Sequence, residues 1–214
     1  GVVVGNEVLD AMPVQLLVRK NGVWHERGVV AEGEAFAWAD RPTALRPPVE
    51  IEGDHDYLTE IHPQGEAFIA SLAERMKAGR GAAAFFLDYG FPEAEYYHPQ
   101  RHMGTVMCHH LHEADDNPLE KVGQKDVTAH VNFTGIAVAA QSAGLEVLGY
   151  TCQAHFLFNL GLTQRMEAAP LAERAQAARL VNEHEMGELF KVIGLATSEW
   201  AAQGFAHGDR THRL

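Results

Sequence analysis

Runs of apolar residues alternate along the chain with segments in which apolar residues recur at helical spacing. Continuous apolar runs predict buried strands at 1–6, 82–90, 145–153 and 191–197. Apolar positions three or four residues apart predict helices within 65–81, 132–144, 154–162 and 170–190. This order of strands and helices predicts an α/β fold, in which helices cover both faces of a largely parallel sheet.

Local turn and cap signals add detail to this pattern. Asn21 and Gly22 separate two β-rich runs within 14–30, and this dipeptide predicts a β-hairpin. Asn132 or Thr134 can cap the start of the second predicted helix. The hairpin therefore interrupts the alternation of strands and helices after the first strand.

Two segments lack a clear period and are expected to be irregular. Residues 31–63 are rich in proline, with one short strand expected at 49–53. Residues 91–127 are rich in His, Pro, Gly and acidic residues, and they predict a long loop of the kind that is usually functional or mobile. We therefore expect one domain with an insertion at about 14–63 and a substrate loop at about 91–131.

The first predicted strand leads directly into polar residues. Asn6 and Glu7 end this strand, and Asp10 follows three residues after Glu7. Ligands of α/β sheets bind outside the carboxyl ends of the strands. Glu7 and Asp10 could hold a guanidinium group in bidentate fashion there. In the alternative interpretation, Asp10 caps a short helix and Glu7 is only solvated.

The predicted strand at 82–90 also ends in an acid. Asp88 could contact a ligand at this strand end, and Tyr89 could cover it. In the alternative interpretation, Asp88 is a turn residue and Gly90 supplies a positive φ angle. Two acidic strand ends in one sheet favour the ligand-binding hypothesis.

A short extended run precedes the helix at 132–144. Asp126, Thr128 and His130 alternate along it, so their side chains share one face. His130 could form hydrogen bonds or transfer protons. The spacing alone favours the alternative, a structural Asp–Thr–His network that holds the loop to the next helix.

The loop before this run contains many residues of metal-ligand type. They are His98, His102, Cys108, His109, His110, His112, Glu113, Asp115 and Asp116. Their spacing matches neither HExxH nor CxxC, so we expect a polar substrate loop, with His110 among the substrate-binding residues, and no native metal. The chain also lacks GxSxG, GxxxxGK[ST] and GxGxxG, so the cofactor loop expected of this fold class is missing.

The composition of the chain argues against some partners. Among 214 residues, 17 are Lys or Arg and 29 are Asp or Glu, which gives a net charge of −12. This charge argues against nucleic acid and against an anionic membrane surface, but it leaves room for a basic protein substrate. The two cysteines, Cys108 and Cys152, form no CxxC motif and fit a reducing compartment, and no apolar run approaches the length of a membrane span.

Several segments together resemble the MidA-like S-adenosylmethionine-dependent methyltransferases. The resemblance covers nearly the whole chain and is strongest in NEVLDAMPV (6–14), LDYG (87–90), the long block from GTVMCHH to FNLGL (104–162), MGELFKVIGLA (186–196) and GDRTHRL (208–214). The family includes the mitochondrial complex I assembly factor that methylates an arginine of a complex I subunit.

The resemblance implies a Rossmann-like class I methyltransferase sheet of seven strands, the last of them antiparallel. In that scheme, 1–6 resembles the fourth strand, 82–88 the fifth, and 145–153 and 191–197 the closing pair. The family's glycine-rich cofactor loop would lie upstream of residue 1. We therefore expect this chain to be the C-terminal part of a longer methyltransferase domain, which could leave the isolated chain inactive. The opening strand would then need cover from the missing half or from another subunit in a homo-oligomer.

The resemblance also implies roles for the candidate residues. The cofactor would be S-adenosylmethionine, held in part by Asn6 and Glu7, and the substrate a protein arginine, for example in a respiratory complex subunit. Glu7 and Asp10 would align the guanidinium group for methyl transfer.

Further residues would bind the substrate, namely Asp88, Tyr89, His110, Asp126, Thr128 and His130. A cytoplasmic protein of bacterial type is expected, with the mitochondrial matrix as the alternative. Two other functions stay open, a non-catalytic assembly factor on the same fold and a metal-assisted hydrolase that uses the His-rich loop.

Overall fold

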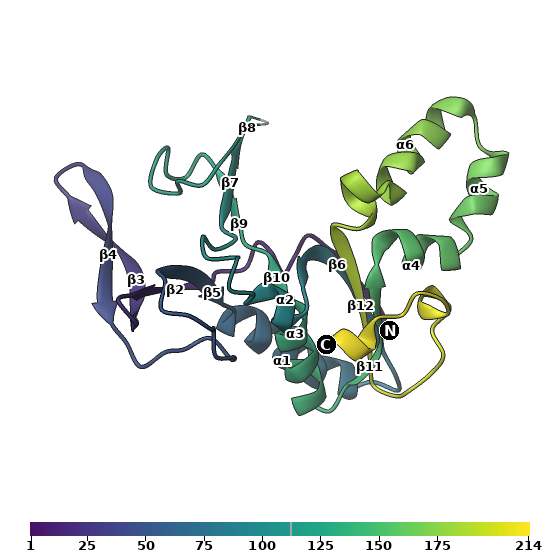
Figure 1. Ribbon diagram of the computed structural model, residues 1–214. Coiled ribbons are helices and arrows are strands. Elements are labelled where there is room, and N and C mark those ends of the chain that lie inside the picture. Colours follow the sequence, from purple (N-terminus) through teal and green to yellow (C-terminus); the bar gives the residue numbers. More distant parts are fainter. Residues whose placement is uncertain (112) are drawn as a thin grey trace.

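The structure is a computed structural model that describes residues 1–111 and 113–214 (Figure 1). Its centre is a five-stranded sheet in the order β1-β6-β12-β11, with β10 paired to the end of β6. The bounds are β1 Val2–Asn6, β6 Ala83–Phe91, β10 Val131–Asn132, β11 Glu146–Cys152 and β12 Phe190–Ala196. β1 and β10 are parallel to β6, whereas β12 is antiparallel to both β6 and β11. The predicted α/β sheet with an antiparallel last strand is therefore confirmed.

Helices cover both faces of this sheet. The first face carries α1 (Pro63–Lys77) and α3 (Phe133–Ser142), which bury an apolar stripe against the strands. The second face carries α4 (Gln153–Asn159) and η2 (Gln203–Phe205), where Phe205 packs with Val192 of β12. The cap signal at α3 is also confirmed, because Asn132 Oδ1 accepts a hydrogen bond from Gly135 N at 3.2 Å.

A second sheet replaces much of the irregular structure expected at 31–63. It has the order β4-β3-β2-β5, with bounds β2 Gln15–Lys20, β3 Val23–Glu32, β4 Ala35–Pro42 and β5 Tyr57–Ile61. The predicted hairpin at Asn21–Gly22 joins β2 to β3. The strand predicted at 49–53 is wrong, because this segment is irregular and Ile51 O instead accepts a hydrogen bond from Arg19 Nη1 at 2.8 Å.

The long loop predicted at 91–127 is also partly ordered. It contains α2 (Glu93–Tyr96) and a small sheet in the order β8-β7-β9. The bounds of this sheet are β7 Met107–His110, β8 Glu113–Asp115 and β9 Asp126–Thr128. Backbone pairing between short polar strands, which hydrophobic periodicity does not reveal, orders the segment.

The helical segment after α4 differs from the prediction, because it contains an additional helix and its second helix ends early. It contains α5 (Leu162–Ala168) and α6 (Leu171–Val181), which have no buried residues and project from the central sheet (Figure 1). The helix predicted at 170–190 ends at Val181 and is followed by the π-helical turn η1 (Glu183–Gly187). The chain closes with the 3-10 turn η3 (Thr211–Arg213).

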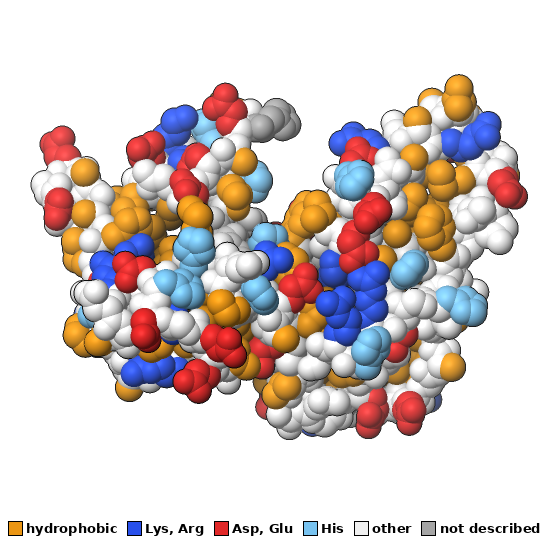
Figure 2. All heavy atoms as spheres, viewed as in Figure 1, with side chains coloured by type: hydrophobic (Ala, Val, Ile, Leu, Met, Phe, Trp, Pro, Cys, Tyr) orange, Lys and Arg blue, Asp and Glu red, His pale blue; other side chains and the backbone are white. Residues whose placement is uncertain are grey.

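The surface is deeply hollowed between the β7–β9 sheet and the α5–α6 projection (Figure 2). The carboxyl ends of β1 and β6 and the start of β12 meet at the base of these two projections (Figure 1). None of the described helices is both long and apolar enough to cross a membrane.

Candidate active site

The turn after β1 is built on the buried carboxylate of Asp88. Glu7 has a φ angle of 51° and donates its backbone N–H to Leu87 O at 3.0 Å. The next three backbone amides, of Val8, Leu9 and Asp10, then donate to Asp88 Oδ2 at 3.2, 2.9 and 3.3 Å. A carboxylate that accepts several backbone N–H groups fixes the path of the chain there. Asp88 therefore holds the Glu7–Asp10 turn against the end of β6.

Asp88 has a different role from the predicted contact with a ligand. Its other oxygen, Oδ1, accepts a hydrogen bond from Tyr89 N at 2.9 Å, and the residue is 1% exposed. Both oxygens thus serve the backbone rather than a ligand. The Gly90 alternative is also wrong, because β6 continues to Phe91. Gly90 is needed for close approach, since a Cβ there would collide with Val131 O.

A cavity of about 890 Å³ opens beside this turn. Six of the residues predicted for the site line it, namely Glu7, Asp10, Tyr89, Asp126, Thr128 and His130. They come from the ends of β1 and β6 and from β9 and the residues after it. The structure therefore brings together three segments, of which the turn after β1 lies more than one hundred residues before β9 in the sequence.

Asp10 is the most unusual of the acidic groups in this cavity. It is 4% exposed, and its Oδ1 atom has no hydrogen-bond partner among the described residues. Burial and then the negative charge of Glu7 raise the pKa of the Asp10 carboxyl. Residues 8–12 form a turn and not a helix, so the helix-cap alternative for Asp10 is wrong. A buried oxygen without a donor fits a site for a cationic or hydrogen-bond-donating ligand.

Glu7 and Asn6 lie at the exposed end of β1. Glu7 Oε1 accepts a hydrogen bond from Asn6 Nδ2 at 2.9 Å, which orients the carboxylate. Glu7 lines the cavity, whereas Asn6 does not. Of the two residues predicted to bind the cofactor, only Glu7 thus has a place in the cavity wall.

The charge of Asp10 influences the ionisation of Asp88. Burial, followed by the negative charge of Asp10, raises the pKa of Asp88 to about 7. The amides of Leu9, Asp10 and Tyr89 oppose this shift, because they favour the ionised carboxylate. The turn therefore places two acids whose pKa values are both raised beside one cavity.

The rings of Tyr89 and His130 also line the cavity. His130 lies 5.2 Å from the Phe91 ring and 6.3 Å from the Tyr89 ring, measured between centroids. Burial, and then the charges of Arg101 and Lys191, lower the pKa of His130 to about 4, so the imidazole is neutral near pH 7. Its Nδ1 atom has no hydrogen-bond partner among the described residues. His130 can therefore offer a neutral ring nitrogen to a ligand.

Asp126, Thr128 and His130 all line the cavity, but Val127 and Ala129 between them line it as well, so the expected alternation is not what selects the three residues. No hydrogen bond joins their side chains in the described part of the chain, so the structural Asp–Thr–His network is not observed. The bond that does hold His130 runs from its backbone N–H to Thr105 Oγ1, at 3.0 Å.

The prediction that His110 belongs to the substrate site differs from the structure. Its Nδ1 pairs with Gln124 O at 2.7 Å, and the residue does not line the cavity. His109 lines it instead, because alternate residues of β7 face opposite sides. The same period of two places Met107 on the cavity, so strand alternation was the signal that could have found both.

Thr105 and Lys125 also line the cavity but were not predicted. Lys125 Nζ lies 2.7 Å from both oxygens of Asp115, so its charge is paired. Among the described residues, no group of three His, Cys, Asp or Glu side chains is placed to hold a metal ion. His112, one of the metal-ligand types counted in the loop, lies outside the described residues.

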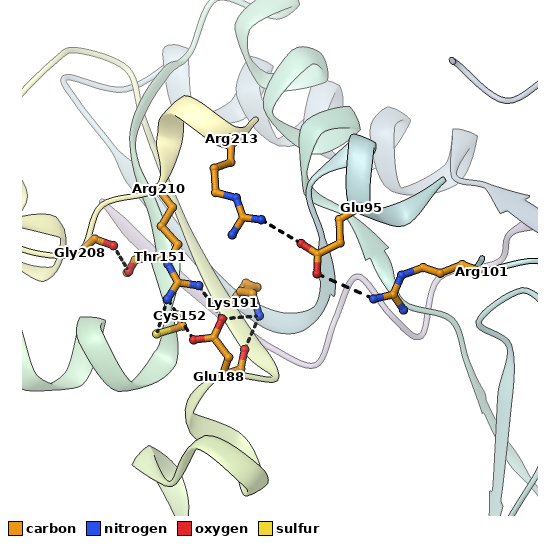
Figure 3. Close-up of polar contacts among 9 residues, drawn as sticks. All are labelled: Glu95, Arg101, Thr151, Cys152, Glu188, Lys191, Gly208, Arg210 and Arg213. Carbon is orange, nitrogen blue, oxygen red and sulfur yellow. Dashed lines mark hydrogen bonds and ion pairs between the residues drawn. The ribbon is translucent and has the colours of Figure 1, made fainter. Parts of the chain in front are cut away.

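A second charged region surrounds the start of β12 (Figure 3). Arg210 donates to both oxygens of Glu188, at 2.5 and 3.0 Å, and Lys191 donates to the Glu188 carbonyl. Nearby, Glu95 lies 3.3 Å from Arg213 and 3.8 Å from Arg101. In this region the acidic side chains are paired with arginine or lysine.

Known proteins resemble the chain in sequence and structure. The model of a family described as "Putative S-adenosyl-L-methionine-dependent methyltransferase" matches residues 1–151. The chain is 25% identical over 209 residues to "Protein arginine methyltransferase NDUFAF7 homolog, mitochondrial" from Caenorhabditis elegans, a match that covers 94% of this chain and 46% of that protein.

Two crystal structures from Burkholderia thailandensis are 44% identical to the chain and cover all of it. One, described as a "likely methyl transferase" bound to S-adenosyl-homocysteine, has a TM-score of 0.90, and the chain covers 58% of it. The other, the native structure of an uncharacterized protein of the same superfamily, has a TM-score of 0.91, and the chain covers 60% of it. The chain thus spans 46% to 60% of the length of these proteins. Because the family model matches well over half of its residues, the chain belongs to this family of S-adenosyl-L-methionine-dependent methyltransferases.

Proposed function

We propose that this protein transfers a methyl group from S-adenosylmethionine to an arginine side chain of a protein. Three similarities support the proposal: the family itself, a structural neighbour that binds S-adenosyl-homocysteine, and a distant relative named as a protein arginine methyltransferase. The observation that carries it is the buried Asp10, whose Oδ1 has no hydrogen-bond partner in the described part of the chain, in a cavity that Glu7 also lines.

The acidic wall suits a guanidinium group. Glu7 and Asp10 offer carboxylate oxygens to a ligand whose planar N–H groups donate in pairs. These contacts would turn one nitrogen toward the methyl group and hold it there, which is the main task in a transfer of this kind. The neutral His130 and the Tyr89 ring would border the guanidinium without adding positive charge.

Asn6 and Glu7 are the residues of this chain proposed to contact the cofactor, at the carboxyl end of β1. The negative wall fits a cofactor that carries a positive sulfonium. When bound, S-adenosylmethionine supplies an electrophilic methyl group. The arginine nitrogen forms a bond to the methyl carbon while the carbon–sulfur bond breaks and its electron pair stays on sulfur.

The nitrogen must also lose a proton. Asp10 is the proposed acceptor, because its raised pKa makes its carboxylate a better base than an exposed aspartate. From Asp10 the proton can pass to water in the open mouth of the cavity. The transfer thus leaves methylarginine, neutral S-adenosylhomocysteine and one released proton.

Methyl transfer to matched peptides tests the proposal. The purified protein would be incubated with methyl-labelled S-adenosylmethionine and with peptides that differ only in carrying Arg or Lys. Label on a guanidino nitrogen, identified by mass spectrometry, is the expected result. Label on lysine would refute the arginine substrate and keep the methyltransferase. A protein that binds S-adenosylhomocysteine in calorimetry but labels no acceptor would instead support a non-catalytic assembly factor.

A further inference from the structure

Glu60 is a fully buried carboxylate outside the cavity. It lies in β5 of the second sheet and is 0% exposed. No ion pair in the described part of the chain includes it. A buried charge is costly unless hydrogen bonds replace its water, so its partners show what it holds in place.

The partners of Glu60 are concentrated on the segment that enters β7. Oε1 accepts hydrogen bonds from Thr105 N at 2.8 Å and from Val106 N at 3.2 Å. Oε2 accepts from the Tyr96 hydroxyl at 2.9 Å and from Thr105 Oγ1 at 3.1 Å. Four donors therefore satisfy one carboxylate, and three of them lie in residues 105 and 106.

The close approach of this segment depends on a glycine. Gly104 has a φ angle of 73°, and a Cβ there would lie 2.6 Å from Glu60 Oε1. The backbone of β5 also pairs with the same segment through a bridge between Leu58 and Met103. The chain before β7 is thus fitted to the Glu60 carboxylate, and the fit needs a residue without a side chain.

Thr105 connects Glu60 to the cavity. Its hydroxyl donates to Glu60 Oε2 and accepts the backbone N–H of His130 at 3.0 Å. Thr105 and His130 both line the cavity, whereas Glu60 does not. We propose that Glu60 is a positioning residue, which acts through Thr105 to set the distance between the β7 wall and His130 and so to align the acceptor side chain. This inference rests on the proposed function.

The chemistry of glutamine gives a matched rescue variant. In Glu60→Gln the amide oxygen can still accept from Thr105 N and Val106 N, while the NH₂ group donates to the two hydroxyls. The Tyr96 hydroxyl can then donate to His62 Nε2, which already lies 3.0 Å away. Glu60→Leu removes every acceptor at similar volume and leaves two backbone amides unpaired.

Steady-state methyl transfer tests this inference on the purified protein. Glu60→Leu is expected to lower kcat by about tenfold to a hundredfold and to raise KM for the arginine peptide. KM for S-adenosylmethionine should not change, and Glu60→Gln should stay within about threefold of the wild type. Glu52→Gln, an exposed glutamate, is the control. A purely structural role would cost only stability, so full activity of folded Glu60→Leu would overturn the inference, as would equal loss in the Gln and Leu variants.

Two further measurements distinguish the outcomes that activity measurements alone leave unresolved. If Glu60→Leu does not fold, Thr105→Val removes the hydroxyl link at nearly the same shape, and about tenfold lower kcat is expected with a cooperative unfolding transition. Amide hydrogen exchange at His130 should be faster in Thr105→Val and in folded Glu60→Leu, but not in Glu60→Gln. Unchanged exchange would refute the inference, whereas a full-length wild-type protein that binds S-adenosylhomocysteine but transfers no methyl group would refute the proposed function instead.

Discussion

The protein has two charged regions, one around Glu188 at the start of β12 and one in the cavity beside Asp10, and they differ in whether their acidic groups are paired. Near η1, Glu188 is held by Arg210 and Lys191 (Figure 3). Burial alone would raise the pKa of Glu188, but the hydrogen bonds from Arg210 keep it below its usual value. In the cavity, Asp10 has a raised pKa and an oxygen that no described residue contacts with a hydrogen bond. The acidic groups of the first region are paired with arginine or lysine, whereas the Asp10 carboxyl in the second region is left available to a ligand.

This difference separates structural charge from charge available to a ligand. A paired acid stabilises the fold modestly and stays ionised, whereas an unpaired buried acid costs stability until a partner arrives. Substitution of a paired acid should therefore lower the free energy of unfolding without changing turnover. Substitution of the unpaired buried acid should lower turnover and leave the free energy of unfolding unchanged or higher.

The largest effect is expected at Glu7. Glu7→Gln removes the negative charge but keeps the oxygen that accepts from Asn6, so the turn should persist. Loss of one charged partner of a guanidinium costs about 3 kcal/mol, which lowers kcat/KM for the arginine peptide by about a hundredfold. Because S-adenosylhomocysteine carries no sulfonium charge and the glutamine amide keeps an oxygen for a polar contact, calorimetry should show S-adenosylhomocysteine binding within about threefold of the wild type. Glu74→Gln on α1 is the matched control, and an active Glu7→Gln variant would remove Glu7 from the site.

Asp88 should make the free energy of unfolding depend on pH. Its pKa is about 7 in the folded protein and near 3.8 when exposed, so the folded state binds more protons between these values. The free energy of unfolding should therefore fall by about 2 kcal/mol as pH rises from 5 to 8, on account of this group alone. Denaturant titrations of Asp88→Asn should show a flatter profile. The exposed Asp54→Asn variant should keep the wild-type slope, and equal slopes in both variants would be the contrary result.

A smaller loss is expected at His130. His130→Ala removes a cavity wall and a neutral ring nitrogen, and should lower kcat/KM by about tenfold, or about 1.4 kcal/mol. Because the pKa of His130 is about 4, this loss should be the same at pH 6 and pH 8. Rate profiles of both proteins across that range check the prediction. A His130→Ala variant with wild-type kinetics would leave only a packing role for the ring.

The smallest effect concerns the paired region. Arg210→Met removes a bidentate ion pair and should reduce the free energy of unfolding by about 1 kcal/mol. Methyl transfer should remain within about twofold of the wild type, since Arg210 is absent from the cavity wall. Chemical denaturation and a rate measurement together test this. A large loss of turnover without loss of stability would erase the contrast between the two regions.

Much of the central sheet could be predicted from the sequence. Its four longer strands are apolar runs, and the run at 1–6 needs no distant information to be recognised. β4 was missed because Glu34, Asp40 and Pro42 obscure its alternation, although Phe36 and Trp38 keep the period of two. β7 and β8 were missed because they are short and polar, so only their pairing defines them, whereas β9 lies in the extended run predicted before the helix at 132–144.

The site was predicted in part for similar reasons. The sequence correctly grouped Asp126, Thr128 and His130 because they lie in one short extended run, although Val127 and Ala129 between them also line the cavity. The role of Asp88 could not be predicted, since its partners are backbone amides about eighty residues earlier. Thr105 was missed for the same reason, because its position depends on Glu60 in another sheet.

One pair of variants tests the difference between the cavity and the paired region most directly. Asp10→Asn and Glu188→Gln each remove one negative charge at nearly constant shape, the first from the cavity and the second from the paired region. The measurement is kcat/KM for methyl transfer to the arginine peptide, with thermal unfolding of the same samples. We predict that Asp10→Asn loses at least about a hundredfold in kcat/KM at an unchanged or higher Tm, while Glu188→Gln keeps its activity and loses Tm. Wild-type turnover by a folded Asp10→Asn variant would contradict the account.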